Sequence, residues 1–449
     1  MPPRIRALCG PALACVMFVV YLRAPIHQVT DSDYSLLLSH SLVFERSFAL
    51  DRHFVFPLDR TVYSGIAPGA ELPSQLVRVG DNLYYWFPLG SSILSVPFVA
   101  LAHPFELSPV RPDGRYDRRG EVRLEARVAA ALMGLWCWLV YGTARLWLPP
   151  RWAVLIALVG GLGTQAMSTA SRSLWSDTWA LVLLQTALLL VVRGERSGHP
   201  PRSFVLAALL SWLYIVRPTH SLSALAVLGL LLVLRRRRLF VETALFAAAW
   251  LSAFVVFSNH YYLSILPPYY RAGRLTFASF GPALLGNLIS PARGLLVYVP
   301  VTIFVAAALL YGWRRIDDKP LAVIAAATAV VYWLATSGYS PWWGGHSYGA
   351  RLMSGVLPWL AMLSAQGVAG LLAAAAVGGR VRRHARVLFL AGAVTVAASV
   401  LINIHGAFFV RAWLWNLYPV DVTQDPDRVW DWRDPQFLAA LKGPREATR

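Results

Sequence analysis

Eleven apolar segments, most of them close to the length that crosses a lipid bilayer, leave few folds open to this sequence. They lie at 7–23, 124–147, 151–168, 174–193, 203–218, 220–234, 240–258, 295–312, 320–337, 352–373 and 386–405. A helix needs about 20 apolar residues to cross the hydrocarbon core. Only 14% of the residues are charged, against about a quarter in an ordinary soluble domain. We therefore expect an all-α polytopic protein embedded in a lipid bilayer.

The positive charges indicate how these segments are oriented. Arginines precede the first segment and cluster in alternate short loops, among them 235–238 and 380–386. Cytoplasmic loops carry an excess of Lys and Arg, so these loops are expected inside. A twelfth apolar segment, 88–105, would reverse all of them if it crossed, and we expect it to lie at the outer interface. The net charge of +18 then reflects membrane topology, and no nucleic-acid partner is expected.

This orientation leaves a long first outer loop, 25–123, and most acidic side chains on the outer face. The stretch 33–44 has apolar residues at helical spacing, which predicts an amphipathic helix along the membrane surface. We divide the chain into a transmembrane domain, 1–405, and an aromatic and acidic outer tail, 406–449. The expected location is the cytoplasmic (inner) membrane, with the active site facing outside.

Two aspartates, Asp31 and Asp33, directly follow the first span. A carboxylate at the mouth of a membrane helix can activate a nucleophile or hold a cation. Either aspartate could instead cap a helix N-terminus, a common role of this residue. The sequence leaves open which of the two would be the base.

Four other outer junctions carry side chains that could bind a phosphate or a hydroxyl. They hold Arg172 and Asp177, then Arg217 and His220, then Arg293, and finally His346 and Arg351. Local ion pairing, snorkelling of a long side chain and an interfacial aromatic belt are the alternatives. The loop 338–351 also contains four glycines, which let backbone N–H groups approach an anion. Arginine can bind a phosphate through two hydrogen bonds. All seven side chains at these junctions are candidate residues for binding the substrate or its phosphate.

Taken in order along the chain, these motifs resemble those of the GT-C glycosyltransferases. That superfamily includes the protein O-mannosyltransferases, the lipid A aminoarabinose transferases and the catalytic subunit of oligosaccharyltransferase. The resemblance is carried by 31–33, by Tyr-Trp-Phe-Pro-Leu-Gly at 85–90, by 171–177, by the loop ending at Arg351 and by 429–435. Among the departures from the family, Ser32 separates two acids that are usually an adjacent Asp-Glu pair.

The resemblance implies interfacial helices in the first outer loop, beside the bundle of about eleven transmembrane helices that the apolar segments and the charge pattern predict. It also implies a polyprenyl-phosphate-linked sugar donor, with a first-loop Asp as base and outer arginines on the donor phosphate. The acceptor would be a glycan, a lipid or a protein.

We therefore expect an inverting membrane glycosyltransferase of the cell envelope. The alternative is a non-enzymatic lipid-linked-sugar transporter or envelope-assembly scaffold, which needs an outer polar cavity but no base. The sequence names no cofactor, and a divalent cation is the one candidate.

Overall fold

Helices make up most of the computed structural model, which describes residues 3–59, 63, 66, 69–271 and 273–439. They are α1 (Pro3–Arg23), α2 (Ser35–His40), α3 (Gly90–Ala102), α4 (Arg118–Ala144), α5 (Pro150–Leu162), α6 (Ser176–Ser197), α7 (Ser203–Val216), α8 (Ser221–Val233), α9 (Arg237–Tyr262), α10 (Phe280–Ile289), α11 (Leu295–Tyr298), α12 (Val301–Gly312), α13 (Lys319–Ser337), α14 (Leu357–Ala376), α15 (Gly379–Phe408) and α16 (Val410–Leu414). The strands β1 (Leu76–Val79) and β2 (Asn82–Tyr85) form one antiparallel hairpin, with Leu76 opposite Tyr85. The predicted all-α class is confirmed at this level.

Six helices are long and apolar enough to cross a membrane: α4, α6, α9, α13, α15 and the run Arg351–Ala376 that contains α14. Each of the other five predicted spans also contains a helix, namely α1, α5, α7, α8 or α12. Some of these helices are short. The 13 residues of α5 rise by only about 20 Å, less than a hydrocarbon core of about 30 Å. The count of eleven spans therefore stays a prediction.

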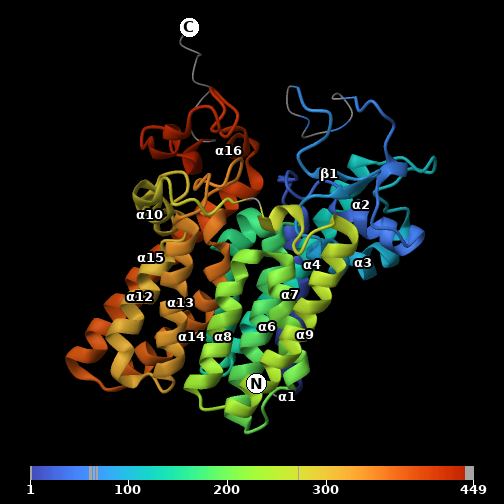
Figure 1. The fold of residues 1–449 in the computed structure, drawn as a ribbon. Coiled ribbons are helices and arrows are strands. Elements are labelled where there is room, and N and C mark those ends of the chain that lie inside the picture. The colour runs from blue at the N-terminus through green and yellow to red at the C-terminus, as the bar shows by residue number, and fades with distance from the viewer. Residues whose placement is uncertain (1–2, 60–62, 64–65, 67–68, 272, 440–449) are drawn as a thin grey trace.

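The long helices run side by side and the irregular segments gather at one end of the bundle (Figure 1). The N-terminus lies at the opposite end from β1, α2, α10 and α16. The end that holds these short elements is therefore the one to which the sequence assigned its outer loops. Part of the tail packs there on the loop 338–351, because Trp342, Trp415, Val422 and Val429 share one apolar cluster. Residues 440–449 of the predicted tail lie outside the described part of the chain.

The first outer loop differs from its prediction. The expected surface helix over 33–44 is a short helix, α2, followed by a π-helical turn, Ser41–Glu45. Residues 35–39 are all buried, so α2 does not lie along a surface. Its leucines are divided between two apolar clusters, with Leu36 against α1 and α4 and Leu37 among the loop aromatics. The amphipathic pattern therefore reflects packing inside the protein.

The segment 88–105 forms α3 and a short 3-10 turn, with some residues buried and others exposed. Gly90 begins α3 against the end of α7, where an added Cβ would lie 2.8 Å from the Ile215 backbone. Ser95 and Val99 are buried further along α3, whereas Leu101 and, beyond the helix, Phe105 are 71% and 76% exposed. Such a half-buried apolar segment fits the prediction of an interfacial element.

Candidate functional site

A polar cavity opens where the first outer loop meets the later outer loops. It has about 940 Å³ of empty space, counted out to the solvent at its mouth. Its charged and titratable lining comprises Asp31, Arg217, Arg274, His346 and Arg351, joined by the three tyrosines Tyr85, Tyr269 and Tyr339. Residues separated by more than 300 positions in the chain therefore line one cavity.

Asp31 is the acidic side chain that faces this cavity. Its Oδ2 accepts a hydrogen bond from Arg351 Nη2 at 2.6 Å. The Tyr85 hydroxyl donates to the Asp31 carbonyl at 2.7 Å and so fixes the backbone. The Asp31 side chain is 38% exposed, whereas that of Arg351 is 10% exposed. A molecule in the cavity can therefore reach the Asp31 carboxylate.

Arg351 is held by an aromatic ring as well as by Asp31. Its guanidinium carbon lies 3.5 Å from the centroid of the Trp175 ring, a cation–π contact that orients the planar group. A further N–H donates to the Gly344 carbonyl at 3.3 Å. The loop 338–351, predicted to bind an anion, therefore supplies both the arginine and a glycine carbonyl that positions it.

Asp33 has a different environment, although only one residue separates it from Asp31. Its side chain is 2% exposed, and Oδ1 accepts from Arg118 Nε at 3.2 Å. It does not belong to the cavity lining. Of the two predicted candidates for the base, the structure brings Asp31 into the cavity and leaves Asp33 behind it.

Two glutamates that sequence reasoning missed support the loops on either side of the cavity. Glu121 and Glu125 are one turn apart on α4 and both are 0% exposed. Glu121 accepts from the backbone N–H groups of Tyr34, Leu36 and Leu37 at 2.9, 2.8 and 3.1 Å. These are the free donors at the start of α2, whose preceding residue offers no side-chain cap. Glu121 therefore caps α2 from another helix.

Glu125 joins the aspartate loop to the loop before α6. Its Oε2 accepts from the hydroxyls of Ser32 and Ser173 at 3.0 and 2.7 Å. A buried carboxylate is costly unless hydrogen bonds satisfy it, so this arrangement fixes both serines. The signal was present in the sequence: Glu121 and Glu125 share a face with Leu124 and Val128 at helical spacing, which places acids on a packed face.

Asp177, Arg217 and His220 form one buried group. Arg217 Nη1 donates to Asp177 Oδ2 at 2.6 Å, and His220 Nε2 lies 3.8 Å from Asp177 Oδ1. Only Arg217 belongs to the cavity lining. The alternative of a local ion pair within 171–177 is not found, because Asp177 pairs with Arg217 at the start of the next outer turn.

Arg172 and Arg293 lie outside the cavity lining, and both are buried. Arg172 donates to the carbonyls of Tyr21 and Ala24 at 2.6 and 2.9 Å, and so ties the end of α1 to the loop before α6. Arg293 donates to the side-chain oxygens of Gln436 and Asn416 at 2.7 and 2.8 Å. Burial lowers the pKa of each to about 10. Their phosphate role stays a prediction, and their placement favours support of the loops.

His346 lines the cavity and connects it to the tail. Its Nε2 lies 2.8 Å from Asp421 Oδ1. Burial alone would raise the pKa of Asp421, but hydrogen bonds from Thr423 and His346 outweigh it and lower that pKa to about 2. The carboxylate is therefore charged at neutral pH and holds His346 at the cavity wall.

Arg274 is the cavity arginine that sequence reasoning missed. Its Nη1 donates to the Tyr339 hydroxyl at 2.9 Å, and its guanidinium lies over the rings of Trp86 and Tyr269 at 5.0 and 5.5 Å. In the sequence it resembles its neighbour Arg271, which donates to the Leu266 carbonyl and lies outside the lining. No spacing rule separates the two in an irregular loop.

Comparisons with known proteins do not place the chain in a family. No protein-family model matches it, and no curated protein does. Among solved structures it is similar to the archaeal oligosaccharyltransferase AglB from Archaeoglobus fulgidus, in complex with an inhibitory peptide and a dolichol-phosphate, with a TM-score of 0.47 and 11% identity. The match covers 98% of this chain and 61% of that one, so the chain spans about three-fifths of that protein's length. A similarity this distant carries no conclusion about activity.

Proposed function

We propose that this chain is a membrane glycosyltransferase that moves a sugar from a polyprenyl-phosphate donor to an acceptor at the outer face. One observation carries the proposal. Asp31 is the one carboxylate among the described residues that line the polar cavity, and Arg217, Arg274 and Arg351 line it too. A base for the acceptor next to cations for a phosphate leaving group is the pair of functions that such a transfer needs.

In the proposed reaction Asp31 takes the proton from an acceptor hydroxyl. The acceptor oxygen forms a bond to the anomeric carbon of the sugar from the side opposite the phosphate. The bond between that carbon and the phosphate oxygen breaks, and the polyprenyl phosphate leaves with the electron pair. Attack from the opposite side inverts the configuration at the anomeric carbon.

Arg274 is the strongest candidate for holding the leaving phosphate. It has no carboxylate partner within 4.0 Å among the described residues, and one of its N–H groups is used by Tyr339. The aromatic rings beneath it fix the plane of the guanidinium. Its remaining N–H groups can therefore meet two phosphate oxygens in the fork geometry that arginine favours.

Arg351 can pair either with the proposed base, Asp31, or with the donor phosphate. In the structure it pairs with Asp31, and a donor phosphate would compete for the same guanidinium. Drawing Arg351 toward the phosphate frees the Asp31 oxygen for the acceptor proton. Donor binding would then prepare the base, which limits proton abstraction to the loaded enzyme.

The rest of the lining suits a sugar at the end of a lipid. Tyr85, Tyr269 and Tyr339 offer rings and hydroxyls, which combine an apolar face with a hydrogen-bonding end. Most of the cavity lining comes from segments between the apolar helices, where the polar headgroup of a lipid would lie. A divalent cation stays part of the proposal, since Asp31 and the donor phosphate are the oxygen ligands that Mg²⁺ and Mn²⁺ prefer.

The test separates a transferase from a transporter. Purified protein in nanodiscs receives radiolabelled polyprenyl-phosphate mannose or glucose, with an envelope extract as acceptor source, and release of polyprenyl phosphate is measured beside donor binding. We expect Asp31→Asn to lose roughly a hundredfold or more of turnover and to keep donor binding. Asp33→Asn is the matched control, because its carboxylate is behind the cavity, and its loss should be milder. Turnover that survives in Asp31→Asn would exclude this base, and donor binding without any release by the wild type would favour the transporter.

A further inference from the structure

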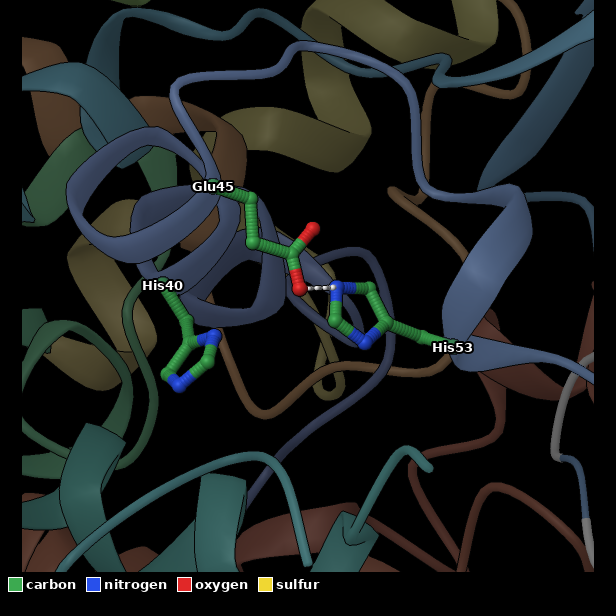
Figure 2. Close-up of side chains that lie close together, drawn as sticks. All are labelled: His40, Glu45 and His53. Atoms are coloured by element: carbon green, nitrogen blue, oxygen red, sulfur yellow. Dashed lines mark ion pairs between the residues drawn. The ribbon is translucent and has the colours of Figure 1, made fainter. Parts of the chain in front are cut away.

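Two histidines and a glutamate converge in the first outer loop, outside the polar cavity. His40 ends α2, Glu45 ends the π-helical turn Ser41–Glu45, and His53 ends a 3-10 turn, Asp51–His53. Figure 2 shows the two rings and the carboxylate turned toward a common space. One nitrogen or oxygen of each residue lies within 4.8 Å of the other two. Three separate turns of the chain therefore bring potential metal ligands together.

His53 is prepared to use its second nitrogen. The side chain is 1% exposed, and its Nδ1 lies 2.9 Å from the Gly114 carbonyl. A carbonyl oxygen can only accept, so this contact assigns the proton to Nδ1 and leaves a lone pair on Nε2. Metal-binding histidines almost always donate their other ring N–H to a carbonyl or a carboxylate in this way.

The buried nitrogens that face this space have no hydrogen bond of their own. Neither His53 Nε2 nor His40 Nδ1 has a hydrogen-bond partner among the described residues. Glu45 Oε1 lies 3.4 Å from His53 Nε2, while Glu45 Oε2 meets Ser41 and Arg52. Two lone pairs that face each other in a buried site repel unless a proton or a cation lies between them. The geometry therefore calls for a positive charge at the centre.

A third histidine, His103, lies next to His40, with its ring centroid 6.4 Å from that of His40.

We propose that His40, Glu45 and His53 bind a Zn²⁺ ion. Two imidazoles and one carboxylate are a zinc donor set, whereas Mg²⁺ and Ca²⁺ prefer oxygen alone. With zinc–ligand bonds of about 2.0–2.2 Å, tetrahedral ligand atoms lie about 3.4 Å apart. The separation of His53 Nε2 and Glu45 Oε1 is already 3.4 Å. The His40 nitrogen lies within 4.8 Å of the other two ligand atoms and would move inward to reach this spacing, with a water as the fourth ligand.

The site would fasten the first outer loop to α2. His53 also contacts the stretch before α4, through its ring to Gly114 and through its carbonyl, which accepts from the Tyr116 N–H at 3.1 Å. Zinc would therefore join the end of α2, the loop 41–53 and the segment that precedes Glu121. This role does not depend on the proposed glycosyl transfer.

Zinc binding is measured directly on the full-length chain, purified in detergent without a histidine tag. The protein is stripped with a chelator, incubated with equimolar zinc chloride, desalted and analysed for zinc by mass spectrometry. We expect about one zinc per chain, and we expect zinc to raise the thermal unfolding temperature. His40→Ala, Glu45→Gln and His53→Ala should each weaken zinc affinity at least tenfold and remove the thermal shift. His199→Ala is the matched control, because His199 is exposed and lies outside the cluster.

Cobalt substitution tests the wild-type protein without any variant. Four-coordinate Co²⁺ with nitrogen ligands gives intense visible absorption bands, whereas Co²⁺ bound weakly at a surface keeps the pale spectrum of the hydrated ion. An intense spectrum that zinc abolishes supports the site even where a histidine variant fails to fold. A wild-type chain that retains no zinc, or a His40→Ala/His53→Ala chain that binds zinc as tightly as the wild type, would overturn the proposal.

Discussion

Replacing Glu121 with glutamine should loosen the first turn of α2. The carboxylate accepts four hydrogen bonds, two at each oxygen: Tyr34 N–H and the Tyr116 hydroxyl at Oε2, and Leu36 N–H and Leu37 N–H at Oε1. In glutamine one oxygen becomes an NH₂ group. With this group at Oε2 the Tyr34 N–H loses its acceptor, whereas the Tyr116 hydroxyl can rotate to accept from the NH₂. Leaving one buried N–H unsatisfied should cost about 1–3 kcal/mol.

Hydrogen exchange of the α2 amides measures this loss of local stability at the start of α2. A loss of about 1–3 kcal/mol in local opening free energy corresponds to exchange about 5- to 150-fold faster in the first turn of α2. Mass spectrometry of peptides spanning 34–40 reads this change in detergent-solubilised protein. The rest of the bundle, measured in the same experiment, should keep its wild-type exchange.

Glu125→Gln supplies the matched control from the next turn of α4. Its Oε2 meets two serine hydroxyls, which can rotate to donate or to accept, while its Oε1 has no hydrogen-bond partner among the described residues. An NH₂ group in place of Oε1 therefore loses no bond, and we expect less than about 1 kcal/mol. Equal α2 exchange in Glu121→Gln and the wild type would refute the capping role of Glu121.

Three further predictions concern the donor and the topology. Arg351→Ala should weaken binding of polyprenyl-phosphate mannose about tenfold or more, and Arg351→Lys should restore only part, because the fork geometry is lost; unchanged affinity in Arg351→Ala would remove this arginine from the site. Arg274→Ala should weaken the same binding, whereas Arg271→Ala, three residues away and outside the cavity lining, should not; equal effects would argue against the cavity as the donor site. In a cysteine-free chain, an impermeant thiol reagent should label Asp427→Cys from outside and leave His199→Cys unlabelled, since only the second lies in an arginine-rich loop; outside labelling at 199 would contradict the predicted orientation.

The sequence was sufficient for the helices and for much of the cavity. All eleven apolar segments contain a helix, because apolar composition and length are local properties. Asp31 and Arg351 could be picked out because each lies at a helix junction on the same expected face. Their pairing over 320 positions was not predictable, since it depends on how α1 and α14 pack.

The arginines show where such reasoning ends. Arg172, Arg293 and Arg351 all sit at outer junctions and look equivalent in the sequence. After folding, the first two meet carbonyl and amide oxygens and the third meets Asp31 at the cavity. The two aspartates divide in the same way, with Asp33 turned to Arg118. What distinguishes these side chains is the partner supplied by a distant segment, and no local pattern encodes it.

The contact between Arg172 and the end of α1 bears on how the chain is made. The carbonyls of Tyr21 and Ala24 accept from Arg172, which lies 151 and 148 residues further along the chain. At about 5–20 residues per second, the ribosome needs roughly 8–30 s to supply it. During that interval the first span is already synthesised while the loop 25–123 emerges without the segment that ties it down. Final assembly of this end of the protein therefore follows synthesis of the segment before α6.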